Sequence, residues 1–160
     1  MNYYIRMAET NEASFIVELL NCVTLDLHKK NINQWTYPWR VHEIYDEIKN
    51  KHIYIIMKGH VIIGIFSLKD INENFEVNFI KSRSIYLYRI AILPEYQGKN
   101  IGKEIINYAY GYSENVNKPL YLNCFAGNEK LRSFYLKSGF DFCGDFPEEG
   151  YSISVFKYYN

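Results

Sequence analysis

The run Ser84–Leu93 (SIYLYRIAIL) is the segment that most limits the folds open to this chain. Its β-branched and aromatic residues predict a long strand, which must stop at Pro94 because proline cannot donate a hydrogen bond to a neighbouring strand. A glycine-containing turn follows, and apolar residues then recur at helical spacing from Ile101 to Ala109. A strand joined by a short turn to an amphipathic helix is typical of a sheet covered by helices.

The rest of the chain predicts further strands and helices around this corner. Before it we expect a strand at Tyr3–Met7, a helix from Asn11 to His28 with Thr10 as N-cap, an aromatic loop at Lys29–Trp39, a helix at Val41–Asn50, and a hairpin of strands Ile53–Met57 and Val61–Leu68. After it we expect strands at Leu120–Cys124, Phe140–Cys143 and Tyr151–Tyr158, and a helix at Asn128–Ser138 that ends at Gly139. Lys69–Ser82 is polar, and we interpret it as a loop or weak strand. The predicted fold is α/β, a mixed sheet of about seven strands flanked by about four helices, in a single domain over residues 1–160.

Composition excludes several classes of protein. Of the 160 residues, 48% are hydrophobic and the formal net charge is +0, so the chain is neither disordered nor the basic protein that binding nucleic acid requires. Residues Met1–Arg6 do not have the charged-then-apolar layout of a signal peptide, so we expect none, and no apolar run approaches the roughly 18 residues of a membrane span. Cys22, Cys124 and Cys143 have no metal-ligand spacing and are expected to be reduced and mostly buried. We expect a cytoplasmic monomer or homodimer with no metal, nucleic-acid or membrane partner.

The turn from Pro94 to Lys103 (PEYQGKNIGK) is the first stretch that suggests chemistry. Backbone N–H groups at such a turn, together with the helix dipole, can bind an anion, and two lysines add positive charge. A Walker A loop is excluded because three residues, not four, separate Gly98 from Gly102 and Glu104 replaces the hydroxyl residue. By spacing alone, an anion site and a plain strand–turn–helix corner are equal alternatives.

The second stretch is the predicted helix that begins at Asn128. Asn128, Leu131, Arg132 and Tyr135 fall at i, i+3, i+4 and i+7, so they share one helix face. Taken alone, Asn128 is an ordinary helix cap, and Tyr135 is one of 16 tyrosines and fits a packed core position.

Together the two stretches resemble the GNAT superfamily of acetyl-CoA-dependent N-acyltransferases. Gln97–Gly102 is similar to that family's pyrophosphate loop, and Asn128, Tyr135 and Gly139–Phe140 are similar to its later helix. The predicted order of elements agrees along nearly the whole chain. Asn100 stands where the loop pattern has a glycine, and we expect it to keep the loop because Asn tolerates a left-handed backbone.

The resemblance implies that acetyl-CoA is the co-substrate and assigns residues to it. The backbone of Ile90, Ala91 and Ile92 would lie alongside the pantetheine arm, Asn128 would contact that arm, and Tyr135 would lie close to the sulfur. The two strands at Ser84–Leu93 and Leu120–Cys124 would splay apart to form the acetyl-CoA cleft. The pyrophosphate would be held by Gln97, Gly98, Lys99, Asn100, Ile101, Gly102 and Lys103.

The implied reaction is direct attack of an amine on the thioester. The N–H of Ile92 would polarise the carbonyl group, and Tyr135 would protonate the departing thiolate, with no metal ion needed. The base that deprotonates the amine is not assigned; the candidates are Glu73, Glu76, His28 and Tyr88.

Acceptor specificity is expected from the first helix, the aromatic loop and the Lys69–Ser82 segment. Gln34, Trp35 and Tyr37 are candidates to line the acceptor pocket, because aromatic faces attract ammonium groups. The alternative is that Trp35 and Trp39 only pin the loop onto the core. The predicted function is transfer of an acetyl group from acetyl-CoA to a primary amine of a small molecule; the alternative is a non-catalytic acyl-CoA-binding sensor or partner module.

Overall fold

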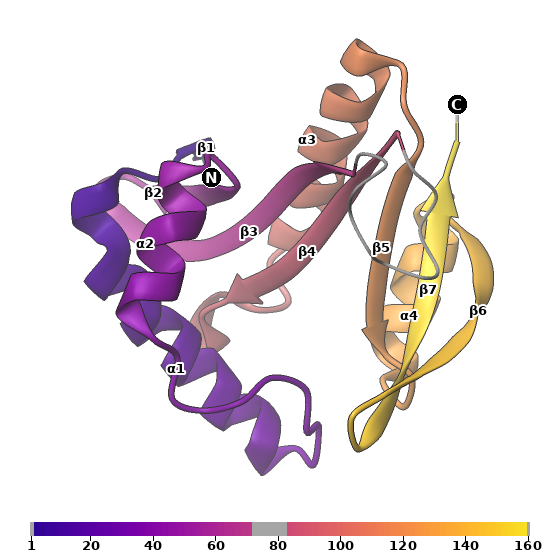
Figure 1. Cartoon of the computed structure of the whole chain (residues 1–160), viewed down its shortest axis with the longest axis horizontal. Helices are drawn as coiled ribbons and strands as arrows, with labels where there is room; N and C mark the ends of the chain where they lie inside the picture. The colour runs from indigo at the N-terminus through magenta and orange to yellow at the C-terminus, as the bar shows by residue number, and fades with distance from the viewer. Residues whose placement is uncertain (1, 72–82, 160) are drawn as a thin grey trace. The chain divides into compact units, whose positions relative to one another are not determined.

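The computed structural model describes residues 2–71 and 83–159 (Figure 1). Seven strands form one mixed sheet in the order β1-β2-β3-β4-β5-β7-β6. The strands are β1 (Tyr3–Met7), β2 (Ile53–Lys58), β3 (Val61–Ile71), β4 (Ser84–Ile92), β5 (Leu120–Phe125), β6 (Asp141–Glu148) and β7 (Tyr151–Tyr158). The helices are α1 (Ala13–Lys29), α2 (Val41–Lys49), α3 (Ile101–Val116) and α4 (Glu129–Lys137), with short 3-10 turns η1 (Thr10–Glu12) and η2 (Pro94–Tyr96). These elements confirm the predicted α/β fold.

The chain forms two compact units. Unit 1 comprises Met1–Leu68 and Arg89–Ile101, and unit 2 comprises Lys69–Tyr88 and Gly102–Asn160. The backbone passes from one unit to the other within β3, within β4 and at the start of α3.

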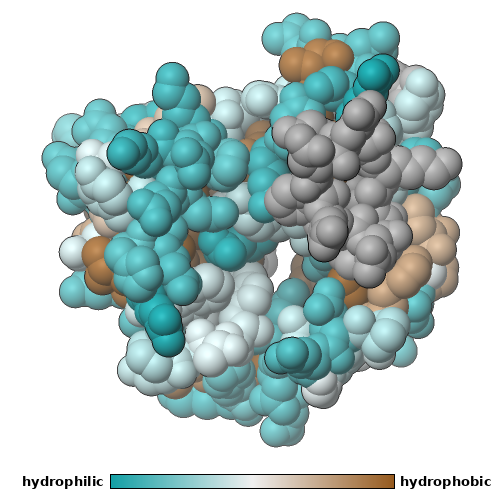
Figure 2. All heavy atoms as spheres, viewed as in Figure 1, coloured by the Kyte–Doolittle hydropathy of each residue, from teal (hydrophilic) through white to brown (hydrophobic). Residues whose placement is uncertain are grey.

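Unit 1 is built around the apolar face of α1. Ile16, Leu20 and Val23 recur at helical spacing on α1 and are buried in one cluster with residues of α2, β2 and β3. On the face that Figure 2 shows, mostly hydrophilic residues cover the side of α1 and α2. Within β3, Gly64 lets β4 approach closely, because a Cβ added there would lie 2.9 Å from the carbonyl oxygen of Ala91.

Unit 2 is built around β5 and β7. These antiparallel strands pair over six residues, from Leu120 with Tyr158 to Phe125 with Ile153. Helix α4 lies behind them in Figure 1, and its Tyr135 ring contacts Phe156 of β7 at 5.6 Å between centroids. Among the described residues, the parallel strands β4 and β5 pair at only two positions, Ile85 with Leu120 and Tyr86 with Tyr121.

The structure corrects three local predictions. Thr10 is not the N-cap, because η1 begins at Thr10 itself and Glu12 accepts a hydrogen bond from the preceding Glu9 N–H at 2.8 Å. Strand β6 continues to Glu148, well past the predicted end at Cys143, because a register shift between Phe142 and Gly144 absorbs one residue and an edge strand tolerates proline.

The third correction concerns the cysteines. All three are free thiols, as predicted, but Cys22 and Cys143 are exposed and only Cys124 is buried.

The segment predicted as a loop or weak strand at Lys69–Ser82 is strand up to Ile71, and residues 72–82 lie outside the described residues.

Candidate active site

The end of β4 presents the backbone of Ile92 on the side away from β3. The N–H of Leu93 donates to the Ile63 carbonyl at 3.0 Å, and the Ala91 carbonyl lies beside Gly64, so both residues face β3. Successive residues of a strand direct their backbone groups to alternate sides, so Ile92 faces the other way. Its carbonyl accepts a hydrogen bond from the Gln97 side chain at 2.9 Å.

The loop after β4 has the backbone that the sequence predicts. Gly98 has φ 75° and Asn100 has φ 65°, both in the left-handed region, and α3 begins at the next residue, Ile101. The predicted left-handed conformation of Asn100 is therefore confirmed. The first N–H groups of a helix have no partner inside it, so those that open α3 can donate to an anion.

Two lysines and an aromatic ring flank this loop. The exposed Lys99 ammonium lies 5.6 Å from the centre of the Tyr96 ring, and Lys58 lies 5.6 Å from the same ring. Lys103, on the first turn of α3, is also exposed.

Gly102 has room for a side chain, because an added Cβ would meet the Phe134 ring at 3.5 Å, an ordinary contact. Packing within the protein therefore does not require a glycine at position 102.

Asn128 serves as the N-cap of α4. Its side-chain oxygen accepts a hydrogen bond from the Leu131 N–H at 3.2 Å. The cap uses the oxygen only, so the side-chain NH₂ group of Asn128 can still donate to a ligand. One turn further, Arg132 donates to the hydroxyl of buried Ser154 at 2.6 Å and lies 3.3 Å from Asp145, which fastens α4 to β6 and β7.

Tyr135 is buried on the same face of α4, with 3% of its surface exposed. Its ring packs against Phe134, Phe140 and Phe156, and its hydroxyl makes no hydrogen bond to any described residue. Burial raises the pKa of Tyr135, with a smaller contribution from Cys124. The phenol therefore stays protonated at neutral pH, as a proton donor must.

Cys124 is buried on β5, and burial raises the pKa of its thiol to about 11. At neutral pH it is neutral and a poor nucleophile. The arrangement therefore offers no cysteine for a covalent intermediate at this position.

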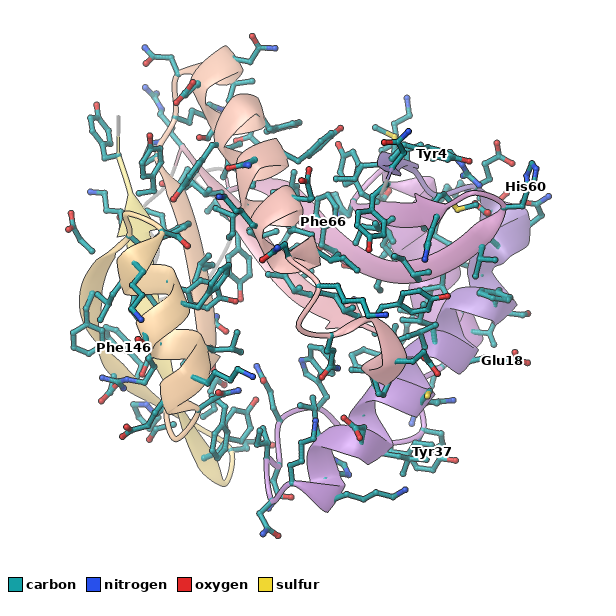
Figure 3. The ribbon with its side chains drawn as sticks, turned by 180° about the vertical axis from the view of Figure 1, so that it is seen from behind. Tyr4, Glu18, Tyr37, His60, Phe66 and Phe146 are labelled. Carbon is teal, nitrogen blue, oxygen red and sulfur yellow. The ribbon has the colours of Figure 1, made fainter. Side chains whose placement is uncertain are left out.

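The aromatic loop between α1 and α2 belongs to unit 1. Trp35 and Trp39 are half-buried, pack against the core cluster and contact each other edge to face at 5.8 Å. This favours the pinning role for both rings. Gln34 is half-buried, and Tyr37 is 46% exposed with its ring directed outward in Figure 3. Of the three candidate acceptor residues on this loop, Tyr37 is thus the most open to a ligand.

The candidate bases fall into two groups. The Nε2 of His28 lies 3.0 Å from the Trp35 carbonyl, so this ring holds the loop. Tyr88 stacks on Tyr86 at 4.9 Å, and the Lys69 ammonium lies 4.8 Å from its ring. The two glutamates proposed from the sequence, Glu73 and Glu76, lie outside the described residues.

The described residues also bear on metal sites and on membrane spans. Over residues 2–71 and 83–159, no group of three or more His, Cys, Asp and Glu side chains is arranged to hold a metal ion. Within the same residues, every helix is too short or too polar to cross a membrane.

Sequence reasoning missed two features near the site. One is Arg89, which has φ 53° inside β4 and is the only charged residue of the SIYLYRIAIL run. The other is a hydrogen bond of 2.7 Å from the Asn123 side chain to the Tyr86 hydroxyl, which links β5 to β4. A polar residue inside an apolar strand was the available signal in both cases.

The match to a known family agrees with this geometry. Residues 20–140 match the acetyltransferase (GNAT) family, and the chain belongs to that family. It is therefore an acetyltransferase by class.

Three known proteins illustrate the similarity. The spermidine N(1)-acetyltransferase of Vibrio cholerae is 28% identical over 159 residues, which cover 95% of this chain and 83% of that protein. A GNAT acetyltransferase from Streptococcus agalactiae has a TM-score of 0.80 at 19% identity, covering 99% of this chain and 95% of its own. The acetyltransferase YncA from Salmonella typhimurium, solved with its cofactor acetyl-CoA, has a TM-score of 0.73 at 12% identity, covering 98% of this chain and 93% of its own.

Proposed function

We propose that the chain acts as one N-acetyltransferase domain over residues 1–160 and transfers the acetyl group of acetyl-CoA to a primary amine of a small molecule. The observation that carries this proposal is the loop Gln97–Asn100, which follows β4 and has left-handed residues at Gly98 and Asn100 directly before α3. The free N–H groups at the start of α3 suit the pyrophosphate of acetyl-CoA. Lys99 and Lys103 supply positive charge beside them.

The proposed donor contacts are assigned to β4 in unit 1 and to α4 in unit 2, and each follows from the local geometry of its own unit. The pantetheine arm pairs with the backbone of Ile90–Ile92. The N–H and carbonyl groups of Ile92 are open to it because they face away from β3. The N–H of Ile92 donates to the thioester oxygen, where negative charge develops when the amine attacks. The free NH₂ group of Asn128 donates to the arm.

The reaction balances without a metal ion or a covalent enzyme intermediate. The amine nitrogen forms a bond to the acetyl carbon, the carbon–sulfur bond breaks, and the amine loses a proton while the thiolate gains one. The Tyr135 hydroxyl donates to the departing sulfur. Because the pKa of Tyr135 is raised while a thiol titrates near 8.5, full proton transfer is uphill, and the hydroxyl acts mainly by its hydrogen bond until water supplies the proton.

Polyamines are the first acceptors to test, because the curated relative with 28% identity acts on spermidine. Gln34 and Tyr37 present an amide and an aromatic face at the surface of unit 1, and such groups suit an ammonium-bearing chain. A panel of spermidine, amino acids, aminoglycosides and a peptide N-terminus, assayed for thiol release from acetyl-CoA, separates these acceptors.

The decisive experiment is calorimetry of acetyl-CoA binding to the purified chain, followed by that panel. We expect binding and thiol release with at least one small amine. Absence of heat and of any shift in melting temperature at millimolar acetyl-CoA would refute the proposal, because a ligand of the folded state must stabilise it. Binding without release on any amine would instead favour the non-catalytic acyl-CoA-binding module.

A further inference from the structure

Arg89 holds a backbone conformation that is rare inside a strand. Its φ of 53° lies in the left-handed region, which residues other than glycine seldom adopt. Such a residue persists only when its surroundings hold it there. Arg89 directly precedes Ile90–Ile92, the backbone that the proposed function assigns to acetyl-CoA, so its conformation sets the direction in which that backbone runs.

Glu47 and Trp39 of unit 1 both contact the Arg89 side chain. Its Nη1 lies 2.8 Å from Glu47 Oε2 on α2, and its guanidinium lies 5.0 Å from the centre of the Trp39 ring. The side chains of Arg89 and Glu47 are only 24% and 22% exposed, so water screens their ion pair less than it would on an open surface. A planar cation stacked on an indole and paired with a carboxylate is well fixed in space.

Trp39 is itself fixed to α1. Its backbone N–H donates to Asn21 Oδ1 at 2.8 Å, and its indole Nε1 donates to Thr24 Oγ1 at 2.8 Å. Thr24 is fully buried and donates in turn to the Leu20 carbonyl at 2.7 Å. The end of the aromatic loop is therefore connected through Trp39 to Arg89, and so to the strand that follows.

We propose that Arg89 is a positioning residue that fixes the backbone of Ile90–Ile92 for the thioester and couples it, through Trp39, to the aromatic loop on the acceptor side. This inference rests on the proposed function. It predicts that a change at Arg89 alters the kinetics of both substrates.

The kinetic test compares Arg89→Gly with a matched control, Lys51→Gly. Glycine accepts a left-handed backbone without strain, so Arg89→Gly removes the side-chain contacts and leaves the conformation accessible. We expect kcat/KM for acetyl-CoA to fall about 10- to 100-fold, because small misplacements of reacting groups have effects of that size, and the acceptor KM to rise as well. Lys51 also has a left-handed backbone, with φ 63°, and is exposed between α2 and β2, so Lys51→Gly should leave both parameters unchanged.

The fluorescence of Trp39 distinguishes a positioning role of Arg89 from a purely structural one. The chain has two tryptophans, so in a Trp35→Phe background Trp39 is the sole indole emitter. We expect saturating acetyl-CoA to change the emission of Trp39, and this change to be lost when Arg89→Gly is added. Arg89→Lys keeps the charge and loses the planar stack, and we expect an intermediate kinetic effect; it also serves if the glycine variant fails to fold.

The outcomes separate this inference from the proposed function. Failure of the wild-type chain to bind acetyl-CoA refutes the proposed function and this inference with it. Binding and turnover by the wild type, with wild-type kinetics for both Arg89→Gly and Arg89→Lys or with an unchanged Trp39 response, overturns the role of Arg89 alone. A loss of stability in Arg89→Gly with no change in either KM or in kcat also overturns it.

Discussion

Replacement of Asn100 tests whether the loop before α3 binds the cofactor. Asn100 is exposed and has φ 65°, so its side chain adds little packing while its backbone carries the constraint. A left-handed backbone costs an ordinary residue roughly 1–2 kcal/mol, less for Asn, nothing for Gly, and most for a β-branched residue. We expect Asn100→Gly to keep or raise stability and Asn100→Val to lose about 2 kcal/mol. In a chain of this length that is a decrease in Tm of about 4–8 °C.

If the loop instead relaxes in the folded Asn100→Val variant, the cost of the left-handed backbone makes the free energy of acetyl-CoA binding less favourable rather than lowering the stability of the fold. Acetyl-CoA must then restore the left-handed conformation, and about 2 kcal/mol corresponds to a roughly 30-fold rise in Kd. Asn100→Gly should bind as well as the wild type or more tightly. Isothermal titration calorimetry measures both values directly.

Asn117 supplies the matched control at the far end of the same helix. It is exposed, has φ 56°, and directly follows α3, whose 16 residues span about 24 Å. Asn117→Gly and Asn117→Val should reproduce the changes in Tm without changing the affinity for acetyl-CoA. Equal Kd values for Asn100→Gly and Asn100→Val would refute the assignment of this loop to the cofactor.

The remaining predictions concern four other parts of the chain. Tyr135→Phe should lower kcat by about 10²-fold with little change in acetyl-CoA affinity, and because burial raises the pKa of Tyr135, the wild-type rate should not fall through its ionisation up to about pH 10. Tyr110→Phe, which loses a hydrogen bond to the Ser138 carbonyl, should lower Tm and leave kcat unchanged. Trp35→Ala should raise the acceptor KM more than the acetyl-CoA KM in steady-state assays, and the reverse order would remove Trp35 from the acceptor side. The Arg6 hydrogen bond lowers the pKa of Glu12 from its ordinary 4.5, so its stabilisation is present above that pH and lost as pH falls through the lowered pKa; the Tm difference between wild type and Glu12→Gln should be largest at neutral pH and vanish in acid.

The elements that the sequence predicted well are those with strong local signals. The β-branched run before Pro94 is β4, Gly139 ends α4 with φ 98°, and Gly59 turns the β2–β3 hairpin with φ 60°. In each case one residue type has a conformational preference that neighbours cannot easily override. The extension of β6 through Pro147 carried no such signal, because it depends on that strand lying at the edge of the sheet.

The candidate site was predictable where it depends on backbone conformation. Asn100 has the left-handed backbone that a substitute for glycine needs, and Asn128 is a helix cap. The roles of Gln97 and Arg89 were not predictable, because each depends on a partner that is defined only in the folded chain. Gln97 donates to the Ile92 carbonyl, five residues earlier, and Arg89 pairs with Glu47, 42 residues earlier.

The distribution of the thiols makes the chain a ready subject for site-specific labelling. Cys22 is exposed on α1 in unit 1, Cys143 is exposed on β6 in unit 2, and Cys124 is shielded by burial that raises the pKa of its thiol to about 11. A maleimide reagent at neutral pH should therefore modify Cys22 and Cys143 and spare Cys124. One probe then reports from each unit without any engineered cysteine, and energy transfer between the two dyes follows their separation as acetyl-CoA is added.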